Sequence, residues 1–247
     1  MSVTNPSTAI VTGASRGFGR ASAAALAAEG WQVLGLARSA RDLAAVQADI
    51  GPRFTPIVGD ATDEGLAAAL IAEHRPRLLV LNAGATPATA PLHEQTWATF
   101  SDGWNTDTRH VFGWVKAALR EPLPPGSTVM AMSSGAALHG SPLSGGWAGA
   151  KAMVGLLTRY AGVEAERMGL GLRFVTLYPT MSATGIGLVG VKAYAARQGV
   201  AEQDFIAGLE PVLTPDLVAK AVVGLAADPD SAAAYVLTGS GPTALEP

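Results

Sequence analysis

Short runs of apolar residues alternate with longer alanine-rich stretches along most of this chain. The short runs are nearly continuous in apolar character, whereas a half-exposed strand would alternate apolar and polar positions. Strands of this kind are typical of a parallel sheet that is covered by helices on both faces. The predicted strands are Thr8–Thr12, Gln32–Ala37, Thr55–Val58, Leu78–Leu81, Ser127–Met132, Leu172–Leu177 and Ala234–Leu237.

The stretches between these runs carry apolar residues at helical spacing. They predict helices at Gly17–Glu29, Ala40–Ala48, Glu64–Glu73, Gln95–Leu119, Gly146–Met168 and Pro215–Ala226. The alternation of strand and helix predicts an α/β fold, a single doubly wound Rossmann-like domain with a mostly parallel seven-stranded sheet and helices on both faces. The whole chain, residues 1–247, then forms one domain.

One segment, Met181–Glu210, interrupts this alternation and is rich in glycine and alanine. Long loops in compact domains are often functional. We expect a substrate lid here, at about 181–210; a plain insertion is the alternative.

Composition narrows the classes of function. The chain has 247 residues, a net charge of -3 and no block of lysine or arginine, so we expect no nucleic acid partner and no anionic membrane surface. It has no cysteine, which excludes disulfides, thiolate metal ligands and a cysteine nucleophile. The polar N-terminus lacks the pattern of a signal peptide, and no apolar run is long enough to span a membrane. We therefore predict a soluble cytoplasmic protein that has no metal site and acts on a small molecule.

A glycine-rich turn joins the first predicted strand to the first predicted helix. Glycine permits a tight turn and lets the backbone approach a pyrophosphate, whose charge is stabilised by the helix N-terminus. The turn therefore predicts a dinucleotide site. Its candidate binding residues are Gly13, Ser15, Arg16, Gly17, Phe18 and Gly19.

From this turn onward the chain resembles the short-chain dehydrogenase/reductase family. The glycine turn matches the family's Gly-x-x-x-Gly-x-Gly pattern, and further matches follow in the family's order over nearly the whole length. They are Asp60 followed by Ala61, Asn82-Ala83-Gly84, Asn105, Ser133-Ser134, Lys151, and Pro179-Thr180 where Pro-Gly is usual. The resemblance implies that Asp60 contacts adenine and that these segments, together with Lys151, hold a nicotinamide cofactor.

The second predicted strand indicates which cofactor. A carboxylate at its end would bind the ribose hydroxyls of NAD and repel a 2′-phosphate. This chain has Ala37 there, followed by Arg38, with Arg16 in the glycine turn. Two guanidinium groups favour a phosphate dianion, so we predict NADP(H). The alternative is that both arginines are ordinary solvated side chains.

The catalytic group implied by the resemblance departs from the family at one position. Counting back from Lys151 places Trp147 in the tyrosine position and Ser134 in the serine position, with Ser133 pointing into the sheet. Lys151 is expected to bind the ribose, and Asn105 to hold a helix distortion and a water chain behind it. An indole N–H donates a hydrogen bond but does not titrate. Since general acid catalysis contributes ~10²–10⁴ in rate, ordinary ketone reduction should be weakened.

Other groups could supply the proton. The candidates are Tyr178, His139, Tyr194, and Lys151 acting through a water. Each of the first three also has a plain interpretation, as a packed aromatic, a surface residue and part of an amphipathic helix. An iminium or α,β-unsaturated substrate would need no concerted proton. Trp147 either stacks on a flat substrate or fills space in a protein without redox activity.

Together these features predict an NADP(H)-dependent oxidoreductase that reduces a C=O, C=N or activated C=C bond of a small organic substrate. The alternatives are a non-redox enzyme on the same scaffold, such as a cyclase or isomerase, and a catalytically silent binding subunit. Long helices and a mean hydropathy of +0.27 favour a homodimer or homotetramer. Trp104, Val111 and Trp114 are the candidate subunit contacts.

Overall fold

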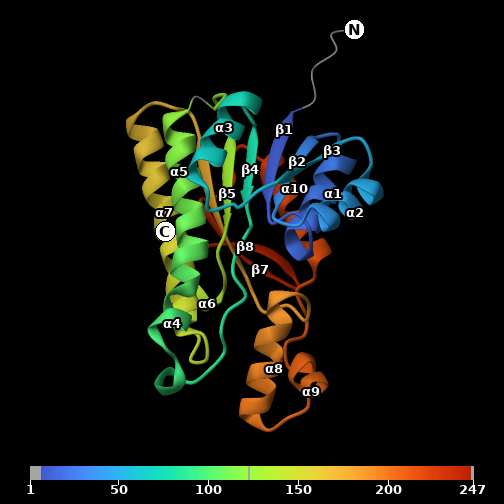
Figure 1. Cartoon of the computed structure of the whole chain (residues 1–247), viewed down its shortest axis with the longest axis vertical. Helices are drawn as coiled ribbons and strands as arrows, with labels where there is room; N and C mark the ends of the chain where they lie inside the picture. Colours follow the sequence, from blue (N-terminus) through green and yellow to red (C-terminus); the bar gives the residue numbers. More distant parts are fainter. Residues whose placement is uncertain (1–6, 122, 246–247) are drawn as a thin grey trace.

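A computed structural model describes residues 7–121 and 123–245 of the chain. Its centre is one twisted sheet with the strand order β3-β2-β1-β4-β5-β6-β7-β8 (Figure 1). The strands are β1 (Thr8–Thr12), β2 (Gln32–Ala37), β3 (Phe54–Val58), β4 (Leu78–Leu81), β5 (Thr128–Met132), β6 (Arg173–Pro179), β7 (Ala234–Thr238) and β8 (Gly241–Ala244). All neighbouring pairs are parallel except β7 and β8.

The eighth strand corrects the prediction of seven. β8 pairs antiparallel with β7 through a tight turn that sets Thr238 opposite Gly241. Its sequence Gly-Pro-Thr-Ala is mostly exposed and contains two residues that disfavour strands. The strand forms because the turn brings it alongside β7 at the edge of the sheet, where a proline is tolerated.

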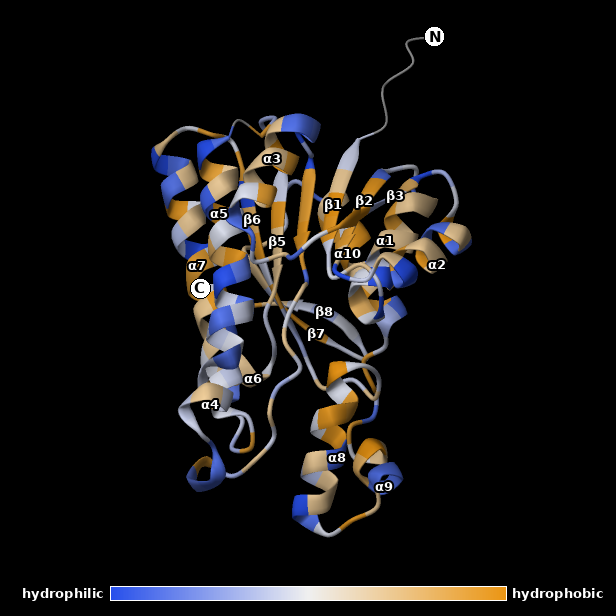
Figure 2. Cartoon of the chain, in the orientation of Figure 1, coloured by the Kyte–Doolittle hydropathy of each residue, from blue (hydrophilic) through white to orange (hydrophobic). Residues whose placement is uncertain are grey.

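Helices cover both faces of the sheet and bury two apolar layers. One layer joins the sheet to α1 (Gly17–Ala28), α2 (Ala40–Ile50) and α10 (Pro215–Ala227). The other joins it to α3 (Glu64–His74), α5 (Arg109–Arg120) and α7 (Gly145–Arg167). Successive residues of β1 point to opposite layers, since Ile10 lies in the second and Val11 in the first. This two-sided burial explains the continuous apolar strands, which are orange in Figure 2.

The predicted helix Gln95–Leu119 is interrupted in the structure. A short 3₁₀ turn, η1 (Leu92–Glu94), precedes α4 (Trp97–Gly103), and a π-helical turn, η2 (Trp104–Thr108), then leads into α5. Thr96 caps α4 by accepting a hydrogen bond from the Thr99 amide at 3.2 Å. A π turn adds a residue to the helical repeat, so residues before and after it do not follow one spacing.

The segment 181–210 forms two helices, α8 (Ile186–Gln198) and α9 (Glu202–Ala207). They extend beyond the sheet, at the same end of the molecule as α4 and the short α6 (Ala136–His139) (Figure 1). The rings of Tyr194 and Phe205 stack between α8 and α9 at a centroid distance of 6.5 Å.

Two of the three predicted subunit contacts lie in the core instead. Val111 and Trp114 are 2% and 0% exposed, and the Trp114 indole donates a hydrogen bond to the Ala61 carbonyl at 2.9 Å. Their apolar stripe faces the sheet because α5 packs between α3 and α7. Trp104 is 48% exposed. Among the described residues, no helix is long and apolar enough to cross a lipid bilayer.

Candidate active site

A cavity of about 1380 Å³ opens at the carboxyl ends of the parallel strands. It lies where the strand order reverses between β1 and β4, which is the position where open α/β sheets bind ligands. The residues proposed from the sequence converge here from distant parts of the chain. The wall includes Gly13, Ser15, Arg16, Gly17, Phe18, Arg38, Asp60, Ala61, Asn82, Ala83, Gly84, Asn105, Ser134, Trp147, Lys151, Pro179 and Thr180.

The glycine turn has the shape that a phosphate cradle requires. Gly13 and Gly17 have φ angles of +67° and +54°, which side-chain-bearing residues rarely adopt. Gly19 lies behind the cavity wall, where a Cβ atom would come within 2.3 Å of the Gly13 carbonyl oxygen. Glycine at this position therefore lets α1 pack closely on the turn.

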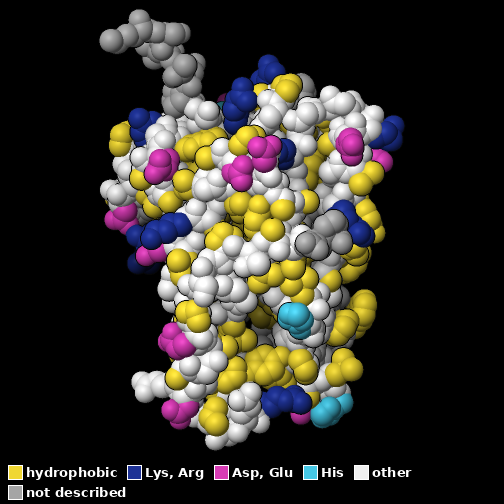
Figure 3. Space-filling model, turned by 180° about the vertical axis from the view of Figure 1, so that it is seen from behind, with side chains coloured by type: hydrophobic (Ala, Val, Ile, Leu, Met, Phe, Trp, Pro, Cys, Tyr) yellow, Lys and Arg dark blue, Asp and Glu magenta, His cyan; other side chains and the backbone are white. Residues whose placement is uncertain are grey.

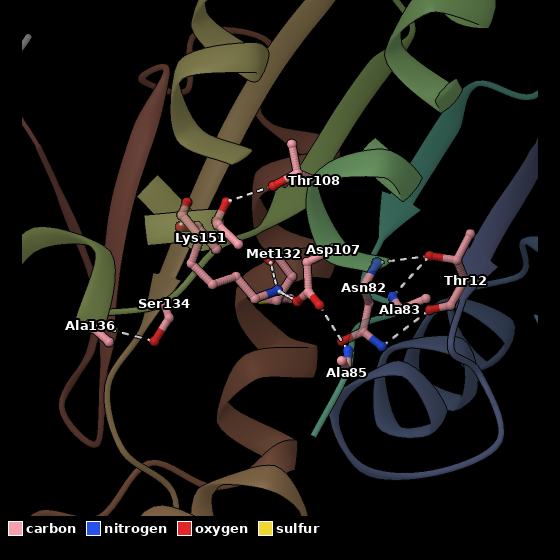
Figure 4. Close-up of polar contacts among 12 residues, drawn as sticks. Thr12, Asn82, Ala83, Ala85, Asp107, Thr108, Met132, Ser134, Ala136 and Lys151 are labelled. Carbon is pink, nitrogen blue, oxygen red and sulfur yellow. Dashed lines mark hydrogen bonds and ion pairs between the residues drawn. The ribbon is translucent and has the colours of Figure 1, made fainter. Parts of the chain in front are cut away.

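The loop after β4 is tied to the loop after β1 (Figure 4). The Thr12 hydroxyl accepts hydrogen bonds from the amides of Asn82 and Ala83 at 2.9 and 3.1 Å. The Asn82 side chain donates to the carbonyl oxygen of Thr12 at 3.1 Å. These contacts fix the Asn-Ala-Gly turn against the phosphate cradle.

The far end of the cavity carries charged side chains. Arg16 and Arg38 are exposed and line this end, where Ser39 caps α2 by accepting from the Asp42 amide at 3.2 Å. The Asp60 carboxylate accepts two hydrogen bonds from Thr62, from its amide and its hydroxyl, both at 2.8 Å. These bonds lower the pKa of Asp60; partial burial opposes them, and the charges of Arg38 and Arg109 add to them. Asp60 is therefore a fixed anion.

Lys151 lies at the opposite end and is 5% exposed. Its ammonium group donates to the Met132 carbonyl at 2.9 Å and forms an ion pair with Asp107 Oδ1 at 2.8 Å (Figure 4). The second oxygen of Asp107 accepts from the Ala85 amide at 2.8 Å. Asp107 thus connects the lysine to the loop after β4.

Asp107 occupies the place behind Lys151 that the sequence analysis gave to Asn105. The expected helix distortion exists, as η2, and Asn105 lies in it, but Asn105 is exposed at the cavity wall. The sequence carried one signal for Asp107. It stands four residues before Val111 and seven before Trp114, so it is a charged residue on the buried stripe of the helix.

The two serines after β5 point in different directions. Ser133 is buried and donates to the Lys151 carbonyl at 2.7 Å, which holds α7 against β5. The Ser134 hydroxyl lies in the cavity wall and accepts from the Ala136 amide at 3.1 Å (Figure 4). Its own proton remains free to donate to a ligand.

Trp147 precedes Lys151 by one helical turn. Its indole packs against α4, where a Cβ atom on Gly103 would lie 3.3 Å from the indole Cδ1. The Lys151 nitrogen lies 5.8 Å from the ring centroid. The indole nitrogen is buried and has no hydrogen-bond partner among the residues that the structure describes. Trp147 therefore provides a rigid apolar wall and no titratable group.

Comparison with known proteins identifies this architecture. The family described as short chain dehydrogenase matches residues 7–189. The chain belongs to the short-chain dehydrogenase/reductase family. It is 30% identical to serine 3-dehydrogenase of Agrobacterium fabrum, covering 90% of this chain and 88% of that one. It is 32% identical to cis-4-hydroxycyclohexanecarboxylate dehydrogenase of Sinomonas cyclohexanicum, covering 91% of this chain and 85% of that one.

Solved structures agree with this assignment. Levodione reductase superposes with a TM-score of 0.84 at 24% identity, covering 95% of this chain and 96% of that one. An oxidoreductase of the family from Burkholderia thailandensis superposes with a TM-score of 0.81 at 26% identity, covering 96% of this chain and 93% of that one. The resemblance and the fold class inferred from the sequence are confirmed, and the family is one of nicotinamide-dependent oxidoreductases.

The side chains considered as proton donors in this dehydrogenase/reductase lie in different places. His139 and Tyr194 line the cavity. Tyr178 packs instead against α7, where a Cβ atom on Gly155 would lie 2.3 Å from its hydroxyl. Burial raises the pKa of Tyr178 more than its hydrogen bond with Thr176 and the charge of Arg159 lower it. The Tyr194 hydroxyl shares a hydrogen bond with Ser141 at 2.7 Å.

The sequence analysis did not single out His110, which lies one helical turn after Asp107 and is 1% exposed. Burial lowers its pKa to about 4, helped by the charge of Lys151 and opposed by Asp107, a weak interaction with the Ala83 backbone, and Asp60. Neither ring nitrogen has a full hydrogen bond within the described part of the chain. The imidazole is therefore neutral at physiological pH and lies in the cavity wall between two charged groups.

Proposed function

We propose that this family member is an NADP(H)-dependent oxidoreductase that reduces a C=O, C=N or activated C=C bond of a small organic molecule. The observation that carries the proposal is a cavity with a glycine cradle at one end of the fold's ligand crevice and a buried, oriented lysine at the other. The cradle fits a dinucleotide because a Cβ atom would fill or strain it at Gly13, Gly17 and Gly19.

The residues have separate roles in this proposal. The pyrophosphate is held by the turn residues Gly13, Ser15, Gly17, Phe18 and Gly19, and the 2′-phosphate by Arg16 and Arg38. The remaining length of the cofactor is lined by Asp60, Ala61, Asn82, Ala83, Gly84, Pro179 and Thr180. When bound, the nicotinamide supplies the hydride. Lys151 donates to the ribose hydroxyls, and Asp107 holds the lysine side chain in place. Asn105 borders the site on η2.

Ser134 orients the reacting group of the substrate, since its hydroxyl is free to donate. Trp147 walls the substrate side and moves no proton. Of the side chains considered as proton donors, His139, Tyr194 and Lys151 line the cavity, so the proton reaches the product from one of them or from water. This route makes ordinary ketone reduction slow and favours substrates that accept hydride without concerted proton transfer.

Preference for NADP(H) rests on Arg16 and Arg38, which lie beside Ala37, where an NAD enzyme would have a carboxylate. Arg38→Ala should weaken NADPH binding about 10-fold or more and leave NADH binding nearly unchanged. Arg41→Ala, on the exposed side of α2, is the matched control. Calorimetric titration with both cofactors tests the assignment, and tighter NADH binding to the unaltered protein would reject it.

Turnover decides between oxidoreduction and the alternatives. Oxidation of NADPH, followed by its absorbance, is expected with at least one member of a panel of ketones, iminium salts and enones. Substrate conversion that does not depend on the redox state of the cofactor would favour a cyclase or isomerase instead. Cofactor binding without any conversion, together with a stable complex with another chain, would favour a silent subunit.

Trp147→Tyr tests whether a general acid is the one group that the site lacks for ketone reduction. Ketone reduction should rise about 10²-fold, at the lower end of general acid catalysis, because Asp107 already balances the charge of Lys151. Trp147→Phe removes the indole without adding an acid and should not raise the rate. Equal rates for the two variants would show that the proton comes from elsewhere.

The same proposal includes assembly as a homodimer or homotetramer. Phe112 on α5, Tyr160 and Val163 on α7, and Met168 just after α7 expose apolar surface on neighbouring helices. Light scattering of the purified protein measures the oligomeric state.

A further inference from the structure

The two ends of the cavity differ sharply in charge. The end at the glycine turn carries Arg16, Arg20 and Arg38. The other end, which the proposed function assigns to the substrate, combines apolar and aromatic side chains with uncharged hydroxyl groups. The apolar and aromatic side chains are those of Trp147 on α7, Met181 in the loop after β6, Ile186 and Tyr194 on α8, and Phe205 on α9; the hydroxyl groups include those of Ser134, Ser141 and Thr184.

The substrate end offers no free cation among the residues described. Lys151 is the one lysine or arginine of the described cavity wall outside the arginine end, and its charge is paired with Asp107 at 2.8 Å in a buried setting. The other ionisable side chains of the described wall away from the arginines are His110, which is buried and neutral at physiological pH, His139, which is exposed, Tyr194 and Asp216. An anionic group bound here would lose its hydration without gaining a partner charge, which is costly.

Helix N-termini are the other common anion sites, and two of them border this end. A backbone carbonyl oxygen already lies beside one glycine in the first turn of each helix. A Cβ atom on Gly146 in the first turn of α7 would come within 1.9 Å of the Phe100 carbonyl oxygen. A Cβ atom on Gly187 in the first turn of α8 would come within 2.0 Å of the Ser182 carbonyl oxygen. These oxygens would repel an anion.

The lid contributes a flat and rigid wall. Tyr194 stacks on Phe205 with an angle of 12° between the rings, and its hydroxyl is bound to Ser141, which in turn is bound to Ser144 at 2.7 Å. These hydroxyls satisfy one another, so they do not require a polar substrate group. Hydrophobic side chains also gather around a hollow in the lower half of the molecule, at the end that carries α4 and the lid (Figure 3).

We infer that the substrate is an uncharged molecule with a flat or ring-shaped apolar body and one reacting polar group, and that the site discriminates against carboxylates and phosphates. The inference rests on the proposed function, because that function assigns this end of the cavity to the substrate. The relatives named for serine and for a cyclohexanecarboxylate act on charged molecules. We infer that this chain does not share that property.

A matched pair of ligands tests the inference. The methyl ester of 4-oxocyclohexanecarboxylic acid and the corresponding carboxylate differ by little more than charge. Equilibrium binding to the full-length protein saturated with 1,4,5,6-tetrahydro-NADP, a reduced analogue whose ring is uncharged and transfers no hydride, is measured by calorimetry, and turnover is measured separately with NADPH. The ester and unsubstituted cyclohexanone should bind at least about 100-fold more tightly than the carboxylate.

The two readouts separate the two proposals. Binding of the ester without turnover supports the inference and counts against ketone reduction. Equal or tighter binding of the carboxylate overturns the inference even if both ligands turn over. Failure of every neutral ring ketone to bind overturns it as well.

A variant gives the converse test. Ile186→Arg places a guanidinium at the apolar wall and should raise carboxylate binding about 10-fold or more relative to the ester. Ile186→Met is the control, because it keeps an apolar side chain of similar volume and should leave the preference for the ester in place. A carboxylate affinity that is unchanged in Ile186→Arg would contradict the assignment of this wall to the substrate.

Discussion

The Asp107–Lys151 ion pair is the residue-scale feature that most distinguishes this site. Both side chains are nearly inaccessible, and each is also held by the backbone, Lys151 by Met132 and Asp107 by Ala85. The Lys151 nitrogen lies 5.8 Å from the centroid of the Trp147 ring, and the Asp107 carboxylate balances its charge. The pair orients the lysine for a ligand without leaving a buried charge uncompensated.

Removing either partner of this ion pair should therefore lower the stability of the folded chain. Asp107→Asn leaves the Lys151 ammonium buried without a counter-charge and should lower the free energy of unfolding by about 3 kcal/mol or more. Chemical denaturation measures this loss. Glu64→Gln makes the same chemical change in the exposed pair Glu64–Lys116, whose atoms lie 2.9 Å apart, and should cost at most about 1 kcal/mol. Similar losses in both variants would contradict the importance of burial.

At the scale of elements, the packing of α1 on the glycine turn determines the shape of the cofactor end. Gly19→Ala would force a Cβ atom to within 2.3 Å of the Gly13 carbonyl oxygen and 2.5 Å of the side-chain nitrogen of Asn82. The turn must then shift. We expect a loss of about 1–3 kcal/mol in stability together with weakened dinucleotide binding.

Gly149→Ala is the control for this substitution. Gly149 lies inside α7, where an added Cβ atom meets nothing within 4 Å. Alanine should therefore raise stability by up to about 1 kcal/mol through its helix propensity. Thermal unfolding with and without NADPH measures both variants, and unimpaired NADPH binding by Gly19→Ala would show that the turn is more adaptable than its geometry indicates.

Tyr194 ties the segment 181–210 to the loop that precedes α7. Tyr194→Phe keeps the stacking on Phe205 but removes the hydroxyl that binds Ser141 and accepts from the Leu143 amide. The lost hydrogen bond contributes about 0.5–1.5 kcal/mol to the free energy of opening. Its removal should therefore increase the equilibrium constant for opening of α8 by about 2- to 10-fold. Hydrogen exchange of α8 amides measures the opening, and Tyr160→Phe on the exposed face of α7 is expected to leave it unchanged.

For the whole molecule, His110 links stability to pH. Its pKa is about 4 in the folded chain against 6.5 for an exposed histidine, so the unfolded chain binds more protons between these values. The contribution of His110 is therefore most favourable to folding above pH 6.5 and becomes unfavourable as the pH is lowered toward 4. The total loss from this group is about 3 kcal/mol.

His110→Phe removes the titrating group while keeping a ring beside Trp114, with which His110 makes an edge-to-face contact at 6.3 Å. The variant should show a smaller decrease in unfolding free energy between pH 6.5 and 4. His139→Phe alters an exposed histidine and should retain the full decrease. A pH dependence that is the same in His110→Phe and the unaltered chain would show that His110 is not the responsible group.

Much of the fold depends on local patterns and could be predicted from the sequence. The seven parallel strands and the helices between them follow from runs of buried residues, and the predicted bounds differ from the observed ones by at most two residues for most elements. The glycine turn, Asn82, Ser134 and Lys151 converge because the carboxyl ends of parallel strands meet at one edge of the sheet. The family is likewise identified by residues that stand in order along the chain.

What only the tertiary structure decided is which way particular side chains point. Asp107 and not Asn105 meets Lys151, because α7 packs against the side of the π turn that carries Asp107, and His110 follows it into the interior. Tyr178 faces a glycine of α7 instead of the cavity, and β8 forms only because a turn places it beside β7. These outcomes depend on contacts between segments distant in sequence, whereas the hydrophobic pattern records only whether a position is buried.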